Sequence, residues 1–254
     1  MSTIRLAVLL VALAAGMPVY ASDEGDGAAV LGPAMALQQP DVAAKKLLKD
    51  GTPHPGFERT HEGFVKIAKS GRTRLLFIGD SITEGWRRYP DLWSTAFGKY
   101  QPANFGIGWD RTQNVLWRLE NGELDGMTPT VAVVLIGTNN LQADPAEGIA
   151  RAIGKIASTI LEHSPTTKVL LLGIFPRGQH SDRNPAREEL AAVNGLVAKL
   201  DDGKHLFFLD IGARFLEPNG DITREMMPEF LHLTEKGYHL WADAIGAKLD
   251  ELMR

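Results

Sequence analysis

The sequence predicts an α/β fold in which a five-stranded parallel sheet carries helices on both faces. Short apolar runs alternate with longer amphipathic stretches along most of the chain. The stretches between the runs are too long for hairpins, so consecutive strands are expected to run parallel, with helical crossovers. A length of 254 residues, with 44% hydrophobic and 23% charged residues, is ordinary for a soluble globular protein with one sizeable core.

The predicted elements follow one another in a regular order. A helix over 57–71 leads into the first strand, because apolar residues recur there at near-helical spacing and the pattern stops at a glycine. Five apolar runs are the predicted strands, at 74–79, 103–108, 131–138, 168–176 and 206–212. The crossovers predict helices near 86–97, 111–121, 145–163 and 184–201, and an amphipathic segment predicts a closing helix over 234–253.

The region before this pattern has a different character. Residues 1–21 have the form of an export signal peptide: Arg5, an apolar run over 6–16, then a small-residue cleavage pattern at Val19 and Ala21. The apolar run is shorter than the roughly 20 residues that span a bilayer. We therefore expect export, to a periplasmic or secreted location.

Residues 22–55 are rich in Ala, Gly, Asp, Gln and Pro and predict an N-terminal arm or linker. Within it, only 41–50 suggests a short helix. The folded domain is expected to start near Gly56 and to cover 56–254.

Charge and motif content argue against several function classes. With 27 Lys and Arg against 31 Asp and Glu, the net charge is −4 and no basic block is present, so nucleic acid is not expected as a partner. The absence of cysteine removes disulfides, thiolate chemistry and a lipoprotein anchor. Neither an HExxH pattern nor a phosphate-binding GxxxxGK[ST] motif occurs, so no metal and no cofactor is expected.

Polar residues gather where the predicted strands end, which is where parallel sheets bind ligands. Ser81 follows the first strand, a glycine-rich segment at 104–110 the second, and Asn139 the third, while Glu229 and His232 precede the last helix. Ester hydrolysis needs a nucleophile, a base, a group that orients the base, and donors for the oxyanion. These residue types can fill all four roles.

Ser81 also has a simpler interpretation. With Glu84 three residues later it matches the capping-box signature of a helix start. Because a nucleophile can also cap a helix, the sequence predicts that Ser81 does both.

Four blocks after residue 60 resemble the GDSL/SGNH hydrolase superfamily, in order: "GDSIT", the glycine-rich block, "GTNN", and a late carboxylate-x-x-His. Longer stretches, such as "NFGIGWDRTQNVLWRLENGELDG" and "FLHLTEKGY", are similar to the catalytic subunits of intracellular platelet-activating-factor acetylhydrolases. The resemblance implies a three-layer, flavodoxin-like fold and a serine esterase. Those relatives work as dimers, so it also implies a homodimer, which no sequence feature displays.

Site residues carry over from this resemblance one by one. It implies Ser81 as nucleophile, His232 as base and residue 229 as the orienting acid. The oxyanion hole would consist of the N–H groups of Ser81 and of residue 109, with the Asn139 side chain.

The chain departs from the family at two of these positions. Glu229 stands where Asp is usual, and Trp109 where the family has an oxyanion-hole glycine. The longer Glu side chain is expected to play a weaker acid role. A bulky residue at 109 is strained if the position needs a positive φ; if that geometry is permitted, the indole is expected to roof the acyl pocket.

Side chains that shorten the acyl pocket in acetyl-selective relatives correspond to Ile82, Thr138 and Leu231, which are bulky or branched. The resemblance therefore implies a small acyl group, acetyl first. The predicted function is an exported, metal-independent serine esterase acting on a lipid or small ester. Two alternatives stay open: a carbohydrate O-acetylesterase acting on acetylated polysaccharide or sugar, and a non-catalytic surface- or carbohydrate-binding module with a decayed site.

Overall fold

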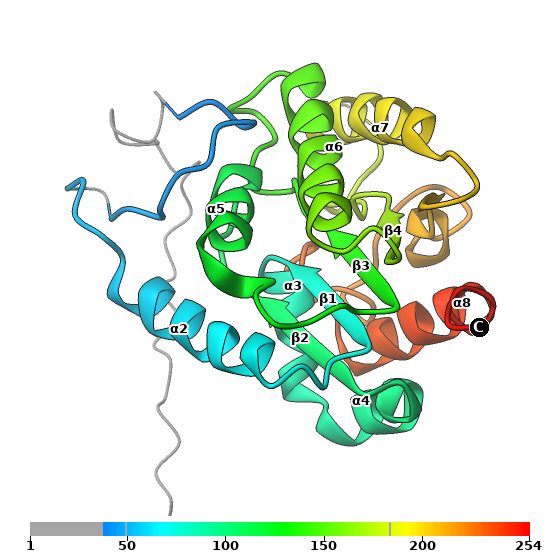
Figure 1. The fold of residues 1–254 in the computed structure, drawn as a ribbon. Coiled ribbons are helices and arrows are strands. Elements are labelled where there is room, and N and C mark those ends of the chain that lie inside the picture. Colours follow the sequence, from blue (N-terminus) through cyan, green and yellow to red (C-terminus); the bar gives the residue numbers. More distant parts are fainter. Residues whose placement is uncertain (1–37, 49, 183) are drawn as a thin grey trace, which may run out of the picture. The chain divides into compact units, whose positions relative to one another are not determined.

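A computed structural model describes residues 38–254 except 49 and 183 (Figure 1). The predicted signal peptide and much of the predicted arm lie outside the described residues. At the centre is a parallel sheet of five strands in the order β2-β1-β3-β4-β5. This confirms the predicted sheet, whose strands are β1 (Leu75–Gly79), β2 (Pro102–Gly106), β3 (Val131–Leu135), β4 (Lys168–Leu172) and β5 (Leu206–Leu209).

Helices occupy the crossovers close to where periodicity predicts them. They are α2 (Pro55–Lys69), α3 (Ser81–Glu84), α4 (Pro90–Phe97), α5 (Thr112–Arg118), α6 (Ala146–His163), α7 (Pro185–Val197) and α8 (Glu235–Leu252). The boundary predicted near Gly56 falls in the first turn of α2. Within the described ranges, no helix is both long and apolar enough to cross a membrane.

The two faces of the sheet carry separate sets of helices, because successive strand residues point to opposite sides. Leu76 and Ile78 of β1 pack with apolar residues of α2, α5, α6 and α7. Leu75 and Phe77 pack on the other face with residues of α4 and α8. Figure 1 shows these two sets on either side of the strands. Both faces of the parallel sheet are thereby buried, as the near-continuous apolar strands require.

The strand order favours ligand binding at the carboxyl edge of the sheet, between β1 and β3. From β1 the chain goes to the edge strand β2 and then crosses back to β3, so the loops after β1 and β3 diverge at the carboxyl ends. The last residues of these strands are in register: Gly79 pairs with both Gly106 and Leu135. A Cβ atom at Gly106 would collide with the backbone of Glu84, so α3 can sit against β2 only because this residue is glycine.

The prediction of a short helix over 41–50 is wrong, because the described residues there are not helical. They lie along α5 instead. The Ala44 N–H donates to the Gln113 carbonyl at 3.0 Å, and the Asn114 side-chain amide donates to the Ala44 carbonyl at 3.0 Å. Leu47 forms an isolated antiparallel bridge with Pro53. The N–H and carbonyl of Ala44, which a helix would pair internally, are thus paired with α5, so tertiary contacts override local propensity.

Candidate active site

Ser81 is the first residue of α3 and is not its N-cap. The Asp80 side chain accepts a hydrogen bond from the Ile82 N–H at 2.9 Å, so Asp80 caps the helix. Glu84 pairs with Arg87 at 2.9 Å. The predicted capping role of Ser81 is therefore wrong by one residue: β1 ends at Gly79, and the cap follows at once. The Ser81 hydroxyl is left available for other partners.

Three residues predicted to act together form one hydrogen-bonded chain. His232 Nε2 lies 2.8 Å from Ser81 Oγ, and His232 Nδ1 lies 2.5 Å from Glu229 Oε1. Because the carboxylate can only accept at Nδ1, that nitrogen carries the proton and Nε2 is free to accept from the serine hydroxyl. The arrangement suits removal of the Ser81 proton.

Glu229 reaches the histidine because of a tight turn. Its Oε1 also accepts from the His232 backbone N–H at 2.9 Å, so the side chain folds back across the turn. Phe230, between them, has φ of 60°, a left-handed conformation that costs a non-glycine residue about 1–2 kcal/mol. Its carbonyl accepts from the Gly178 N–H at 2.8 Å and its N–H donates to the Met227 carbonyl at 3.0 Å, and these bonds hold the turn.

Asn139, after β3, points its amide toward the loop that follows β2. Its Nδ2 donates to the Asp110 carbonyl at 2.9 Å, which uses one of the two hydrogens on that nitrogen. Next to it, the Thr138 carbonyl accepts from Arg177 Nη1 at 2.9 Å. Burial lowers the pKa of the Arg177 guanidinium, and the nearby Asp80 charge opposes this shift. Arg177 therefore fixes the backbone that carries Asn139.

Trp109 has the positive φ that the usual glycine predicts, at 63°. Its side chain is 74% exposed. The preceding Gly108 lies beside the nucleophile, since a Cβ built on it would be 3.9 Å from the Ser81 Cβ. Trp109 lines a cavity of about 190 Å³ beside the N-terminal arm, with Gln38, Lys46, Leu47, His54, Gly108, Arg111 and Asn114.

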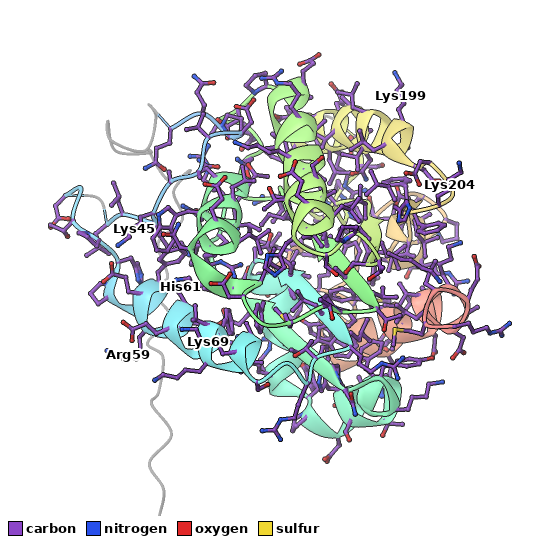
Figure 2. All side chains as sticks on the ribbon, in the orientation of Figure 1. Lys45, Arg59, His61, Lys69, Lys199 and Lys204 are labelled. Carbon is purple, nitrogen blue, oxygen red and sulfur yellow. The ribbon has the colours of Figure 1, made fainter. Side chains whose placement is uncertain are left out.

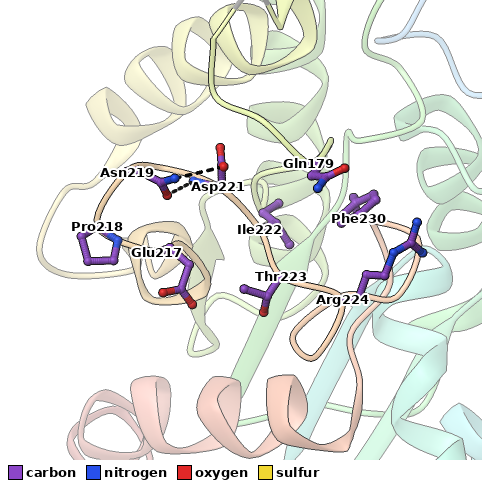
Figure 3. A pocket seen from close by; sticks show the side chains of 9 residues that line it. All are labelled: Gln179, Glu217, Pro218, Asn219, Asp221, Ile222, Thr223, Arg224 and Phe230. Atoms are coloured by element: carbon purple, nitrogen blue, oxygen red, sulfur yellow. Dashed lines mark hydrogen bonds between the residues drawn. The ribbon is translucent and has the colours of Figure 1, made fainter.

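A larger cavity, of about 530 Å³, borders the turn that contains Glu229 and His232 (Figure 3). Phe230, the neighbour of Glu229, closes one end of it, and the Arg224 guanidinium lies 4.9 Å from the centre of the Phe230 ring. Its lining residues are Gln179, Glu217, Pro218, Asn219, Asp221, Ile222, Thr223, Arg224 and Phe230. The turn that holds the histidine therefore also shapes a large open groove.

The residues predicted to shorten an acyl pocket differ in their surroundings. Ile82 and Thr138 are buried, and Ile82 belongs to the core on the α8 face. Leu231 is half-buried against the same core. Their role as an acyl pocket stays a prediction. Across the described ranges, no group of three or more metal-ligating side chains is present.

A buried ion network behind the loop after β2 has no counterpart in the sequence analysis. Asp110 forms an ion pair with Lys46 at 2.7 Å and accepts a hydrogen bond from Arg118 Nε at 2.9 Å. Arg118 also pairs with Glu123, which lies 2.8 Å from His61 Nδ1. Figure 2 labels His61, on α2, and Lys45 on the nearby arm. No local motif marks these partners, because Lys46 lies in a segment with linker-like composition.

Comparisons with known proteins show the family and the fold of this chain. The sequence profile of the GDSL-like Lipase/Acylhydrolase family matches residues 77–240. The platelet-activating factor acetylhydrolase IB subunit alpha1 of Bos taurus is 40% identical over 179 residues, which cover 70% of this chain and 75% of that protein.

Two solved structures share the fold at lower identity. A GDSL-like lipase from Bacteroides thetaiotaomicron has a TM-score of 0.59 at 21% identity, over 77% of this chain and 97% of that one. A catalytic mutant of an acetylxylan esterase from Geobacillus stearothermophilus has a TM-score of 0.54 at 18% identity, over 70% and 93% of the two chains.

Proposed function

This chain belongs to the GDSL-like lipase/acylhydrolase family and is an ester hydrolase, and from that premise we propose that it is an exported serine esterase selective for short acyl groups, acetyl first. The observation that carries the proposal is the hydrogen-bonded chain from Ser81 Oγ through His232 to Glu229. A binding module with a decayed site would not need these contacts, and here they are intact.

The reaction proceeds through an acyl-enzyme. His232 Nε2 takes the Ser81 hydroxyl proton as Oγ bonds to the ester carbonyl carbon, and Glu229 stabilises the resulting imidazolium. The imidazolium then gives this proton to the leaving alcohol as the ester C–O bond breaks. Water, deprotonated by the same nitrogen, attacks the acyl-serine, and the proton returns to Ser81 as the carboxylic acid leaves.

Three donors are proposed to hold the oxyanion. In the described part of the chain, the backbone N–H groups of Ser81 and Trp109 donate to no protein acceptor. Asn139 retains one amide hydrogen beyond the one given to Asp110. Donors that are already fixed in place stabilise a developing negative charge without reorganising during the reaction.

The acyl group of the proposed ester substrate is acetyl or similarly short. Support comes from the bulk at Ile82, Thr138 and Leu231 and from a relative whose name states acetylhydrolase activity. That relative is 40% identical, so the same acyl selectivity is a reasonable extension to this chain.

The alcohol part is proposed to be a lipid or another small alcohol, and a second candidate is a sugar. The exposed Trp109 indole beside the polar side chains of Gln38, His54 and Asn114 favours the sugar, since an aromatic plate with a few polar groups suits a flat polar ring. Release of acetate from acetylated xylan, acetylated monosaccharides and an acetylated ether phospholipid, compared under one condition, separates these candidates.

Export rests on the sequence of residues 1–21. If the proposal is right, the mature protein isolated from outside the cytoplasm begins at Ser22, and Edman or mass-spectrometric sequencing of its N-terminus checks this. A protein that keeps Met1 contradicts it. The homodimer implied by family resemblance stays a prediction that sedimentation analysis tests.

The esterase proposal is tested by hydrolysis of p-nitrophenyl acetate. Wild-type protein is expected to turn over the ester, and Ser81→Ala is expected to lose at least about 10³-fold in kcat. A Ser81→Ala protein with undiminished turnover would contradict the assignment of the nucleophile.

A further inference from the structure

Lys46 is a buried lysine in the segment that precedes α2. It is 8% exposed, and its ammonium lies 2.5 Å from the Gly108 carbonyl oxygen and 2.7 Å from Asp110 Oδ1. A buried ammonium is costly unless it is paired and hydrogen-bonded. Both partners of Lys46 belong to the loop after β2, so this lysine is fixed to that loop.

The carbonyl that Lys46 holds belongs to the same peptide unit as the Trp109 N–H. Peptide bonds among the described residues are all trans, so the carbonyl and the N–H of this unit point in opposite directions. With the Gly108 carbonyl turned to Lys46, the Trp109 N–H is turned away from it. Gly108 also lies beside Ser81, so this peptide is close to both the lysine and the nucleophile.

The peptide between Gly108 and Trp109 needs contacts from other residues to keep its orientation. Trp109 has φ of 63°, and the left-handed region costs a bulky residue about 1–2 kcal/mol, so relaxation would rotate the peptide. The Asn139 amide fixes the Asp110 carbonyl, two residues after that of Gly108, at 2.9 Å. Lys46 is the group that fixes the carbonyl of Gly108, and its positive charge also polarises that peptide and strengthens the N–H as a donor.

The positive charge of Lys46 is balanced by nearby carboxylates, and its hydrogen bond to the Gly108 carbonyl is kept. Asp110 receives Lys46 on one oxygen and Arg118 on the other, and Arg118 in turn pairs with Glu123. The network of two cations and two carboxylates is neutral in sum. Lys46 therefore forms an ion pair with Asp110 and at the same time donates a hydrogen bond to the Gly108 carbonyl.

We propose that Lys46 is a positioning residue for ester hydrolysis: from the N-terminal arm, it fixes and polarises the 108–109 peptide so that the Trp109 N–H faces the oxyanion. The inference rests on the proposed serine-esterase function. It adds a role for a segment that lies before the matched family region.

The test compares Lys46→Met with Lys45→Met as a matched control. Lys45 is the neighbouring lysine, but its side chain is 42% exposed and pairs with Glu58 on the surface. The full-length mature protein is assayed with p-nitrophenyl acetate. Its reactive sites are counted by fluorophosphonate labelling, so that kcat refers to folded, reactive enzyme. The inhibition constant of trifluoroacetophenone, whose adduct with the serine carries an oxyanion, is a separate measure of the oxyanion hole.

For Lys46→Met we expect kcat per labelled site to fall about 10- to 100-fold, somewhat less than the loss of an oxyanion donor itself. The inhibition constant should rise by a similar factor while KM stays within about threefold. Lys46→Arg, which keeps the charge and the donors, should recover most of the loss. Lys45→Met should match the wild type in all three quantities.

A buried carboxylate left without Lys46 could prevent folding, so the same assays use Lys46→Met/Asp110→Asn as a second variant, in which both charges are removed together. It should show the same loss in kcat and the same rise in the inhibition constant. An unchanged inhibition constant, or kcat per site within threefold of wild type, would overturn the role of Lys46. Absence of fluorophosphonate labelling in the wild type would instead refute the esterase proposal itself.

Discussion

His232 Nε2 lies 2.8 Å from Ser81 Oγ, although 151 positions separate the two residues in the sequence. Ser81 begins α3, two residues after the last residue of β1, and His232 precedes α8, which packs on one face of the sheet. Their meeting is a consequence of the parallel topology, which brings loops from distant segments to one edge of the sheet. The predictions below follow from what surrounds this pair.

Acyl-chain length should control the rate strongly. If Ile82, Thr138 and Leu231 limit the acyl pocket, kcat/KM for p-nitrophenyl butyrate should be at least about tenfold below that for the acetate, because each misfit methylene costs 1–3 kcal/mol. Leu231→Ala, at the half-buried position, should reduce the difference in kcat/KM between the acetate and the butyrate. Equal rates for acetate and butyrate in the wild type would contradict the pocket assignment.

Glu229 should matter less than the acid of a buried triad. Its side chain is 53% exposed, so water can replace part of its stabilisation of the imidazolium. Glu229→Gln keeps an acceptor oxygen but removes the charge, and kcat should fall about 10- to 100-fold, compared with about 10⁴ in the serine-protease template.

Glu225→Gln is the matched control for this prediction, because Glu225 is exposed and pairs with Lys236. It should leave kcat unchanged. Steady-state kinetics with p-nitrophenyl acetate decide the question. No loss in Glu229→Gln would mean that the orienting acid is elsewhere or is not needed.

Trp109 stores backbone strain that glycine would release. Trp109→Gly should be more stable than Trp109→Ala by about 1 kcal/mol, because alanine retains the Cβ that disfavours a positive φ. Urea unfolding measures the difference. Gln101, with φ of 51°, is another non-glycine residue in the left-handed region, and Gln101→Gly should likewise be more stable than Gln101→Ala. An alanine variant as stable as the glycine variant at 109 would refute the strain.

Asp80 should make stability fall as pH rises. Burial raises its pKa from 3.8 to about 7, so the folded protein binds this proton more tightly than the unfolded chain. Its stabilising contribution is full below the unfolded pKa and is lost as pH rises from about 4 through about 7. At about 1.4 kcal/mol per pKa unit, the loss amounts to a few kcal/mol.

The measurement is the free energy of unfolding of wild type and of Asp80→Asn at about pH 4 and about pH 8. Asn cannot ionise, so the wild type should lose stability relative to this variant over that interval. Asp202→Asn serves as control: backbone N–H donors, that of Leu206 first, lower the pKa of Asp202 to about 2, outside the interval. A constant difference between wild type and Asp80→Asn would contradict the raised pKa.

Local patterns predict the sheet, and together with the family resemblance they predict the residues of the hydrogen-bonded chain. Apolar runs mark strands wherever both faces are buried, and serine, carboxylate and histidine stand at strand or helix ends that topology brings together. The predicted helix cap at Ser81 is one residue too late, because "DSIT" and "SITE" both fit a helix start and only the end of β1 at Gly79 decides between them.

Contacts of the N-terminal arm could not be predicted in this way. Lys46 meets Gly108 across 62 positions of sequence, and nothing in "DVAAKKLLKD" distinguishes it from its exposed neighbour Lys45. The same segment has helical propensity that its backbone bonds to α5 override. Burial of a charged side chain by a distant loop is a tertiary property, and it carries no local signature.

The most direct test of the central claim is the site of covalent labelling by a fluorophosphonate, mapped by peptide mass spectrometry on the full-length mature protein. The phosphorus should be attacked by the nucleophilic serine, with fluoride leaving. The account predicts a single adduct on Ser81 in the wild type and none in Ser81→Ala. An unlabelled wild-type protein, or an adduct on another residue, would contradict it.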